Sequence, residues 1–369
     1  MDFVYGSRGK EEKLQYLKKT VRVFGPMIIC FALLLGIDYG YKHSEKYEDS
    51  LEEQWDKFIT EKSINGTFLQ SRRFFNYHPA GRFKDVSLVV YNEKNNIAAL
   101  IPACELEQDG KKVFFSHKGT TFGGIIIDKK HHNAKHVVVL VEELKDYLKE
   151  QGYNEAYLKM TSDIFSEVES DLFQYAFQHA GYTEHKELST YVNYATYKEA
   201  ILSNFAQGKR TNVHNCEKEG LECRPLTTDD EIKEFYDILC ENLSKYDTKP
   251  VHTLAELLDF KNDRFPKECG FFGIFKEEEM LAGSMMFYFD KVGCAHTQYL
   301  AARQAFNKLS PMTFMYYSMI VEMKNRGYKR ISWGTATEDL GNYLNMGLIT
   351  SKEDFGSSYC NNLTYSITL

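Results

Sequence analysis

The feature that most constrains this chain is a supersecondary pattern that occurs twice. In the first half a helical pattern ends at residues 149–153, around Gly152, and leads into a short apolar run. In the second half a helical pattern ends at residues 324–328, around Gly327, and leads into a similar run. A strand-turn-strand pattern precedes each copy. A duplicated lobe of this kind predicts a cleft between the lobes, and clefts are where ligands bind.

Periodicity and turn residues divide the chain into four parts. Residues 1–45 are an N-terminal appendage, residues 46–196 a first lobe, residues 197–220 a helical hinge and residues 221–369 a second lobe. Strands rich in Val, Ile and aromatic residues alternate with helices, which is typical of α/β architecture. The predicted strands are 87–91, 97–107, 112–117, 124–127, 189–194, 221–225, 270–276, 280–289 and 295–301, and the predicted helices are 50–59, 137–151, 166–179, 197–219, 229–243 and 311–326.

Composition excludes several classes of protein. At 369 residues, with 43% hydrophobic and 26% charged residues, the chain is globular and long enough for about two domains. Its net charge of −7 excludes a general nucleic-acid binder, although a local basic patch could hold a phosphate or the end of a tRNA. The eight cysteines form no Cys-x-x-Cys pair and no zinc-type spacing, which favours a reducing cytoplasm.

The N-terminal residues combine a basic stretch, residues 10–22, with an apolar run, residues 27–37. The run is shorter than the roughly 20 residues that span a bilayer, and no small-x-small cleavage site follows it. Two interpretations stay open. The segment is a packed element or an over-long gene start, or it has a membrane or export role with weak membrane contact at the inner face.

Polar residues are densest where the second-lobe strand after residue 330 ends. Thr337, Glu338 and Asn342 place a hydroxyl, a carboxylate and a carboxamide beyond this strand, a mixture that favours ligand binding. The alternative is an ordinary capped loop, in which Thr337 and Asp339 cap the next helix. In the first lobe, Gly123-Gly124 at the corresponding strand exit permits close approach of a ligand, or marks a bulge.

Three strings resemble one known family. Residues 334–356 read Gly-x-x-Thr-Glu-Asp-x-Gly-x-Tyr-Leu-Asn-x-Gly-Leu, followed by Lys-Glu-x-Phe-Gly, and are similar to the signature end of the FemAB-like branch of the GNAT acyltransferase superfamily. Residues 71–85 resemble the first-lobe opening of that group, and residues 208–213 resemble its Lys-Arg-x-Asn linker helix. The resemblance covers residues 48–369. It implies two tandem GNAT-like lobes with mixed, mostly antiparallel sheets joined by a helical hinge.

The resemblance also implies a function. The chain is expected to move an acyl or acetyl group to an amine or hydroxyl of a cell-surface polysaccharide or envelope precursor, a small-molecule or glycan-precursor acceptor, in the cytoplasm. The co-substrate would be acyl-CoA, such as acetyl-CoA, or aminoacyl-tRNA. One alternative is a FemAB-type peptidoglycan bridge aminoacyltransferase that uses aminoacyl-tRNA; the other is a non-catalytic module that binds a glycan precursor.

One stretch departs from the GNAT pattern. GNAT enzymes hold the CoA pyrophosphate on a Gly-rich turn before a helix, but residues 302–311 contain no glycine, which puts acetyl-CoA in doubt. Arg303, Lys308 and the helix that starts at Pro311 could still attract a phosphate. Lys352 lies near the family's Phe-Lys motif, although Ser351 replaces the phenylalanine.

These arguments define the expected site. Glu338 is the candidate base, Tyr299 a candidate proton donor and Lys352 a third catalytic group near the donor substrate. Residues expected to hold substrate are Tyr77, His78, Arg82, Arg210, Thr337, Asn342 and Asn345. For Arg210 a solvated helix face is the alternative. No metal is expected, because the spacing of Asp128, His131, His132 and His136 fits no standard motif.

Overall fold

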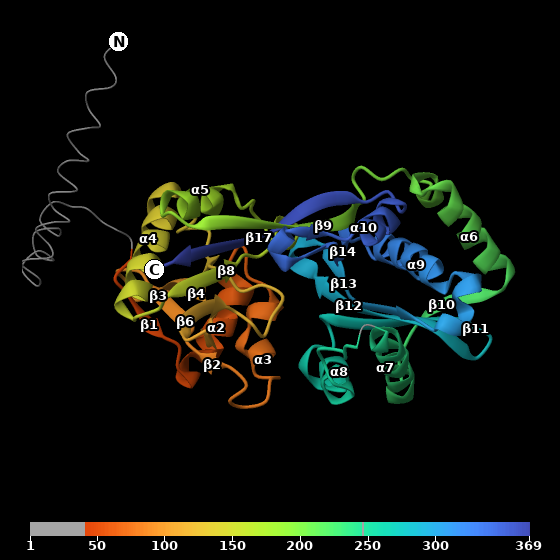
Figure 1. Cartoon of the computed structure of the whole chain (residues 1–369), viewed down its shortest axis with the longest axis horizontal. Coiled ribbons are helices and arrows are strands. Elements are labelled where there is room, and N and C mark those ends of the chain that lie inside the picture. Colours follow the sequence, from red (N-terminus) through yellow and green to blue (C-terminus); the bar gives the residue numbers. More distant parts are fainter. Residues whose placement is uncertain (1–40, 246) are drawn as a thin grey trace, which may run out of the picture.

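One mixed sheet of eleven strands runs through both lobes of the computed structural model, which describes residues 41–245 and 247–369 (Figure 1). Its strand order is β10-β11-β12-β13-β14-β9-β17-β8-β6-β5-β2, and most neighbouring strands are antiparallel. The bounds are β2 Lys84–Asp85, β5 Cys104–Gln108, β6 Lys111–Ser116, β8 Glu155–Lys159, β9 Thr183–Asn193, β10 Leu221–Pro225, β11 Cys269–Lys276, β12 Glu279–Phe289, β13 Cys294–Ala302, β14 Arg330–Thr335 and β17 Ser358–Thr368.

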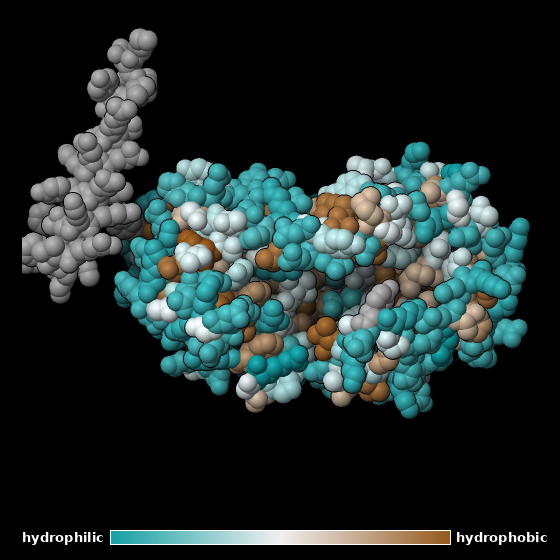
Figure 2. All heavy atoms as spheres, in the orientation of Figure 1, coloured by the Kyte–Doolittle hydropathy of each residue, from teal (hydrophilic) through white to brown (hydrophobic). Residues whose placement is uncertain are grey.

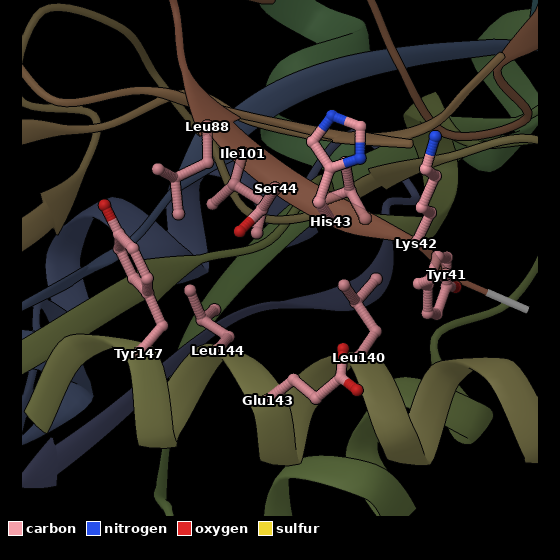
Figure 3. A pocket seen from close by; sticks show the side chains of 11 residues that line it. Tyr41, Lys42, His43, Ser44, Leu88, Ile101, Leu140, Glu143, Leu144 and Tyr147 are labelled. Carbon is pink, nitrogen blue, oxygen red and sulfur yellow. The ribbon is translucent and has the colours of Figure 1, made fainter. Parts of the chain in front are cut away.

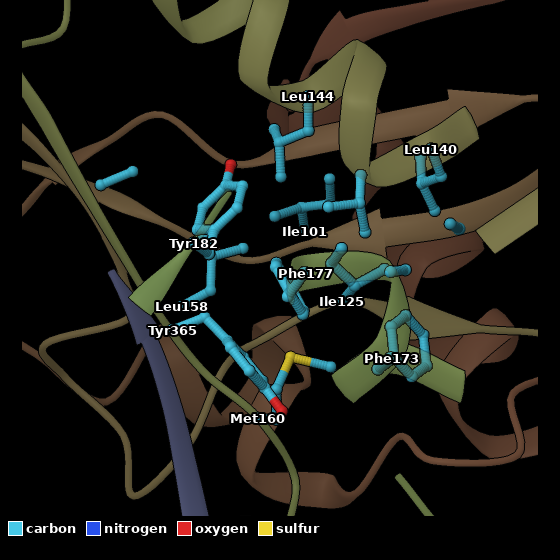
Figure 4. Packing of buried hydrophobic residues seen from close by; sticks show 14 of the residues in the cluster. Ile101, Ile125, Leu140, Leu144, Leu158, Met160, Phe173, Phe177, Tyr182 and Tyr365 are labelled. Carbon is cyan, nitrogen blue, oxygen red and sulfur yellow. The ribbon is translucent and has the colours of Figure 1, made fainter. Parts of the chain in front are cut away.

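The first lobe adds a smaller sheet and two helices. The small sheet has the order β1-β3-β4-β7, with bounds β1 His43–Lys46, β3 Leu88–Tyr91, β4 Ile97–Ile101 and β7 Ile126–Ile127. Helix α4 (Ala134–Glu150) buries Val137, Val141 and Leu148, which recur at helical spacing, and the Asn133 side chain caps its start. Helix α5 (Asp171–His179) covers the same core, where the Phe177 and Tyr365 rings stack at 4.2 Å (Figure 4).

The second lobe is a sheet covered on both faces. Helices α7 (Asp229–Ser244) and α8 (Leu254–Asp259) lie on one face, and α9 (Pro311–Asn325) and α6 (Gln207–Lys218) on the other (Figure 1). Pro311 occupies the first turn of α9, where its missing N–H has no helical partner to lose. Capping boxes start α7 and α8, at Thr228 and Thr253.

Two long strands connect the lobes. Strand β9 belongs to the predicted first lobe, residues 46–196, but pairs with β14 of the second lobe. Strand β17, the last of the chain, pairs with β9 and also with β8 of the first lobe. Each half therefore contributes one strand to the shared centre of the sheet.

The lobes also pack directly through aromatic rings. Phe68 of the first lobe lies 5.3 Å, centroid to centroid, from both Phe265 and Phe287 of the second. The Arg73 guanidinium donates to the Asp263 carbonyl oxygen at 2.8 Å beside these rings. This junction is buried hydrophobic core, so it fixes the lobes relative to each other.

The mixed α/β fold with mostly antiparallel sheets is as predicted. The hinge differs from the prediction. Its helix is present as α6, but the buried side chains Val213 and Cys216 pack it near α9 at the outer end of the second lobe. Strands β9 and β17 connect the lobes instead. Residues 1–40 of the predicted appendage lie outside the described residues. Residues 43–45 belong to the first lobe, because β1 pairs with β3. Within the described chain, no helix has the length and apolar character needed to cross a bilayer.

Candidate active site

Strands β13 and β14 are parallel neighbours that separate along their length. They pair only from Cys294 to His296 on β13 and from Arg330 to Ser332 on β14. Beyond this point β14 pairs with β9 alone, and β13 pairs with β12 alone among the described strands. The separation leaves a wedge, here called the second-lobe wedge, where β13 backbone groups have no ladder partner on the β14 side. Backbone N–H groups placed in this way can donate to the oxygen of a bound acyl group.

The first lobe contains the same divergence, but its own chain fills it. Strands β6 and β8 are parallel and part after Ser116. The Gly123 N–H donates to the Lys159 carbonyl at 3.0 Å, and the Gly124 N–H donates to Ser116 Oγ at 2.8 Å. Gln70 Nε2 donates to the Gly123 carbonyl at 2.6 Å and holds the inserted segment in place. Of these two wedges, the second-lobe wedge is therefore the better candidate for a substrate site.

Lys352 reaches the edge of the second-lobe wedge from α10 (Met346–Glu353). Its ammonium donates to the carbonyl oxygens of Gly334 at 3.0 Å and Thr335 at 2.8 Å. The side chain is 3% exposed, and burial lowers its pKa from 10.5 to about 8. A protonated lysine has three N–H donors. Two are used here, so the third can donate to a ligand.

His296 lies beside this lysine at the point where the strands part. Its Nδ1 is 3.1 Å from Ser332 Oγ. Burial and the nearby Lys352 charge lower the pKa of His296 to about 4, so the ring is neutral at pH 7. Gly334 follows with φ +74°, and a Cβ there would lie 3.3 Å from His296 Cε1. The left-handed backbone at this position therefore favours glycine, and a Cβ would also press on the His296 ring.

A second group joins the two lobes at the Tyr77 side chain. Tyr77 Oη lies 3.2 Å from His252 Nε2, and His252 Nδ1 lies 2.7 Å from Tyr299 Oη. Tyr77 follows α3 (Arg72–Phe75) in the first lobe, His252 precedes α8, and Tyr299 stands on β13, three residues beyond His296. His252 is 4% exposed, and burial lowers its pKa to about 4. We call these three side chains the Tyr-His-Tyr bridge.

His78 and Arg82 extend this group on the first lobe. His78 Nε2 donates to the Gly119 carbonyl at 2.7 Å, since a carbonyl only accepts. Its Nδ1 is buried and has no hydrogen-bond partner among the described residues. Arg82 is exposed, and its positive charge acts on the pKa values of Tyr77, His78 and His252. Figure 2 shows the surface hollowed between the lobes, in the region that Figure 1 borders with α3, α8 and β13.

The polar segment after β14 forms a small hairpin of β15 (Thr337–Glu338) and β16 (Tyr343–Leu344). Thr337 is buried, with Oγ1 3.0 Å from Thr335 Oγ1, while Glu338 and Asn342 are exposed. Asn345 caps α10 by accepting from the Leu348 N–H at 3.0 Å. Capping therefore occurs in this loop, but through Asn345. The apolar side chains Leu340 and Tyr343 of the hairpin are exposed, as are Met346 and Leu348 in the first turn of α10.

A short helix precedes α9, in the segment where the sequence analysis expected a phosphate to bind. Residues Gln304–Leu309 form a 3₁₀ helix in place of a glycine turn. Arg303 donates to the Met280 carbonyl and to Glu234 Oε1, each at 2.9 Å, so its guanidinium is already engaged. Lys308 and Arg210 are exposed, whereas Lys209 donates to Ser351 Oγ at 3.2 Å.

Two cavities lie elsewhere. One of about 450 Å³ sits at the lobe junction and is lined by polar residues that include Asp163, Lys186, Arg330 and Asn361. The other, of about 190 Å³, is a slot between β1 and α4 in the first lobe, with Glu143 at its rim (Figure 3). Within residues 41–245 and 247–369, no three His, Cys, Asp or Glu side chains are grouped so that they could hold a metal ion.

Several solved structures share this fold. FemX aligns with a TM-score of 0.63 at 11% identity, covering 89% of this chain and 98% of that one. L-PGS from Bacillus licheniformis aligns at 0.58 with 15% identity (88% and 93% covered), and a tandem GNAT protein of clavulanic acid biosynthesis at 0.51 with 7% identity (88% and 98% covered). At these identities the likeness concerns the fold, which is a tandem GNAT fold. No curated protein matched the sequence.

The family follows from the sequence itself. Residues 51–249, more than half of the chain, match the model of the FemAB family, and the chain belongs to that family. The predicted resemblance is thereby confirmed. The protein is an acyltransferase or aminoacyltransferase, and its donor and acceptor are taken up below.

The structure brings some of the predicted site residues together and separates others. Tyr77, His78, Arg82 and Tyr299 lie together at the interlobe hollow, and Lys352 lies at the second-lobe wedge. Thr337, Glu338 and Asn342 lie on the hairpin, Asn345 caps α10, and Arg210 lies on α6. Sequence reasoning missed His252. The capping box formed by Thr253 and Glu256 would have predicted α8 and placed His252 just before its cap.

Proposed function

We propose that this protein transfers an aminoacyl group from aminoacyl-tRNA to an amine of a peptidoglycan precursor in the cytoplasm. The observation that carries the proposal is the buried Lys352 ammonium at the second-lobe wedge, where carbonyl oxygens take two of its three N–H donors. The wedge would hold the donor ester, and the interlobe hollow would hold the acceptor.

Two observations favour tRNA over CoA as the carrier. The glycine turn that would cradle a pyrophosphate is replaced by the 3₁₀ helix, and Arg303 is engaged with Glu234. The exposed cations Arg210 and Lys308 remain available at this end of the second lobe. Exposed cations of this kind contact a nucleic-acid backbone through its phosphates, in a manner that weakens with salt.

The chemistry needs few groups. The acceptor amine attacks the ester carbonyl, a C–N bond forms, the C–O bond to the tRNA ribose breaks, and the amine proton passes to the departing oxygen. Negative charge develops on the carbonyl oxygen during attack. Lys352 and the unpaired β13 N–H groups would stabilise this charge, and the Tyr299 hydroxyl is proposed to assist proton transfer.

The base is a separate question. Glu338 remains the candidate from the sequence, and its exposed position on the hairpin would let it act only if the hairpin contacts bound substrate. Glu338→Gln tests this directly, because it removes the base and keeps the shape. Loss of turnover in a folded variant would support the role, and full activity would assign the proton transfer to substrate or water.

The proposal is tested by offering the purified chain two labelled donors. One is a pool of tRNA charged with ¹⁴C-amino acids and the other is ¹⁴C-acetyl-CoA, each with UDP-N-acetylmuramyl-pentapeptide as acceptor. Label should reach the acceptor from tRNA only, and ribonuclease should abolish it. Transfer from acetyl-CoA that survives ribonuclease would instead establish the acyl-CoA function.

A matched pair of variants links turnover to the site. Lys352→Met should lose transfer, whereas Lys145→Met should keep it, because Lys145 also donates to a backbone carbonyl, that of Ala180, but from α4. Binding of the precursor without transfer from either donor would favour the non-catalytic module.

A further inference from the structure

The Tyr-His-Tyr bridge crosses from one lobe to the other through a neutral imidazole. His252 accepts or donates at both ring nitrogens, to Tyr299 at 2.7 Å and to Tyr77 at 3.2 Å. A neutral imidazole carries one N–H and one lone pair, so one tyrosine must donate to it and the other must accept from it. The direction of the bridge follows from which tyrosine donates.

Tyr299 is the donor. Tyr299 Oη lies 2.7 Å from His252 Nδ1, the usual separation for an O–H donor, whereas Tyr77 Oη lies 3.2 Å from His252 Nε2, at the long end of the range for an N–H donor. These lengths favour an O–H of Tyr299 that donates to His252 Nδ1, with the ring proton on Nε2.

Tyr77 is then the acceptor within the bridge and a donor outside it. His252 Nε2–H donates to Tyr77 Oη, so the Tyr77 hydrogen must point to another group. The Tyr77 side chain is partly exposed, at the hollow between the lobes, and Arg82 is close enough for its charge to act on the Tyr77 pKa. Arg82 forms no ion pair among the described residues. A hydroxyl donor beside an unpaired guanidinium binds an anionic oxygen.

We propose that His252 is a positioning residue that fixes the Tyr77 hydroxyl as a hydrogen-bond donor toward the hollow, where Tyr77 and Arg82 bind a carboxylate or phosphate oxygen of the acceptor substrate. The inference rests on the proposed function, because it takes the hollow as the acceptor site. The groups that face His252 are Glu256 on α8, the helix that follows it, and His78 and Arg82 from the first lobe. The Glu256 carboxylate accepts from the Thr253 N–H at 2.6 Å, and its charge raises the pKa of His252 without offsetting the effect of burial.

The tautomer can be measured without any substrate. In the full-length protein labelled with ¹⁵N-histidine, long-range ¹H–¹⁵N spectra at pH 7 should show one neutral ring protonated at Nε2 that disappears in His252→Gln. A ring protonated at Nδ1, or a cationic ring, would overturn the proposal whatever the transfer assay shows. Failure of transfer with every donor would count against the proposed function and leave this measurement valid.

The kinetic test uses the precursor UDP-N-acetylmuramyl-pentapeptide as the probe. Tyr77→Phe and His252→Phe should each raise its KM about tenfold with kcat nearly unchanged, the loss of one hydrogen bond to a charged group. His252→Gln keeps an amide donor toward Tyr77 and should stay within about threefold of wild type. The double variant Tyr77→Phe/His252→Phe should be no worse than either single variant, because both act through one hydroxyl.

Matched controls lie on α5. Tyr175→Phe and His179→Gln make the same chemical changes on exposed side chains and should leave KM unchanged. Additive effects in the double variant, or a fall in kcat with constant KM, would refute the positioning role. If His252→Phe fails to fold, Tyr77→Phe and His252→Gln still decide, because a purely structural histidine predicts no KM change in Tyr77→Phe.

Discussion

Replacing Lys352 by methionine should separate catalysis from folding. The lowering of the Lys352 pKa from 10.5 to about 8 corresponds to about 3 kcal/mol of desolvation that the charged form bears in the folded protein. Its two hydrogen bonds to carbonyl groups offset this by about 1.5–3 kcal/mol each. Lys352→Met removes both terms and leaves Gly334 and Thr335 carbonyls near solvent, so stability at pH 7 should change by less than about 2 kcal/mol.

Activity should respond far more strongly. Removing one donor that stabilises a developing oxyanion typically lowers kcat by about 100- to 1000-fold. We therefore expect Lys352→Met to fold, to unfold in urea near the wild-type midpoint, and to transfer label at least about 100-fold more slowly. Retention of kcat within about threefold would refute the role of Lys352 at the wedge.

The pH dependence provides the second part of this test. Because the folded pKa is below the unfolded value, the cost of the charge is present below about pH 8 and is relieved as pH rises toward 10.5, so stability from this group rises over that range. Catalysis should move in the opposite direction. Wild-type kcat should fall above about pH 8 as the ammonium loses its proton, whereas Lys352→Arg stays charged and should not show this fall. The same alkaline fall in Lys352→Arg would assign it to another group.

Three further outcomes follow from the same physical terms. Gly334→Ala should cost about 1–2 kcal/mol in urea unfolding, since a φ of +74° strains alanine, with a larger relative loss of turnover; a wild-type midpoint would contradict this. Asp85→Ala should destabilise the protein by about 3 kcal/mol, because it leaves the Arg72 guanidinium, 1% exposed, without its carboxylate partner. Arg72→Met removes the buried charge itself and should cost less. A larger loss of stability in Arg72→Met than in Asp85→Ala would contradict this account of the ion pair. The buried imidazoles of His117, His252 and His296 have pKa values lowered from 6.5 to about 4. The free energy of unfolding should therefore fall as pH drops from 6.5 toward 4, by up to about 2 kcal/mol per ring at pH 5. Urea titrations at pH 7.5 and pH 5 measure this loss, and equal stability at the two pH values would argue against buried neutral rings.

The sequence predicted regular elements well because their signals are local. The apolar spacing of α4, the proline at the start of α9 and the Phe- and Met-rich strands β11 and β12 of the second lobe all appear where expected. Strand β17 was missed because Asn361 and Asn362 lower its strand propensity. Its place is decided by pairing with β8 and β9, both far away in the sequence, which no local pattern reveals.

The candidate site was predictable only where it follows a family string. Lys352 was found through such a string, and its burial distinguishes it from an ordinary solvated surface lysine. Glu338 and Asn342 belong to the same string, but the turn at Asp339 and Leu340, with φ near +50°, carries them to the surface. Residue types alone could not show this outward turn. His252 was missed for the converse reason, because a single histidine gains meaning only from the two tyrosines that the fold brings to it.

The duplicated lobes reach one candidate active site because the same glycine signal has opposite outcomes in them. Gly123 and Gly124 permit close approach at the first-lobe strand exit, and the group that approaches is the chain itself: a Cβ on Gly123 would lie 2.6 Å from the Ser116 carbonyl carbon. The first wedge is thereby sealed by backbone hydrogen bonds, and Gln70 is fully buried against it. At Gly334 the neighbouring groups are instead the His296 ring and the Lys352 ammonium. Both are side chains with polar hydrogens, so they can donate hydrogen bonds to a ligand in place of a contact within the protein. A duplicated fold can therefore devote one divergence of strands to rigidity and the other to chemistry.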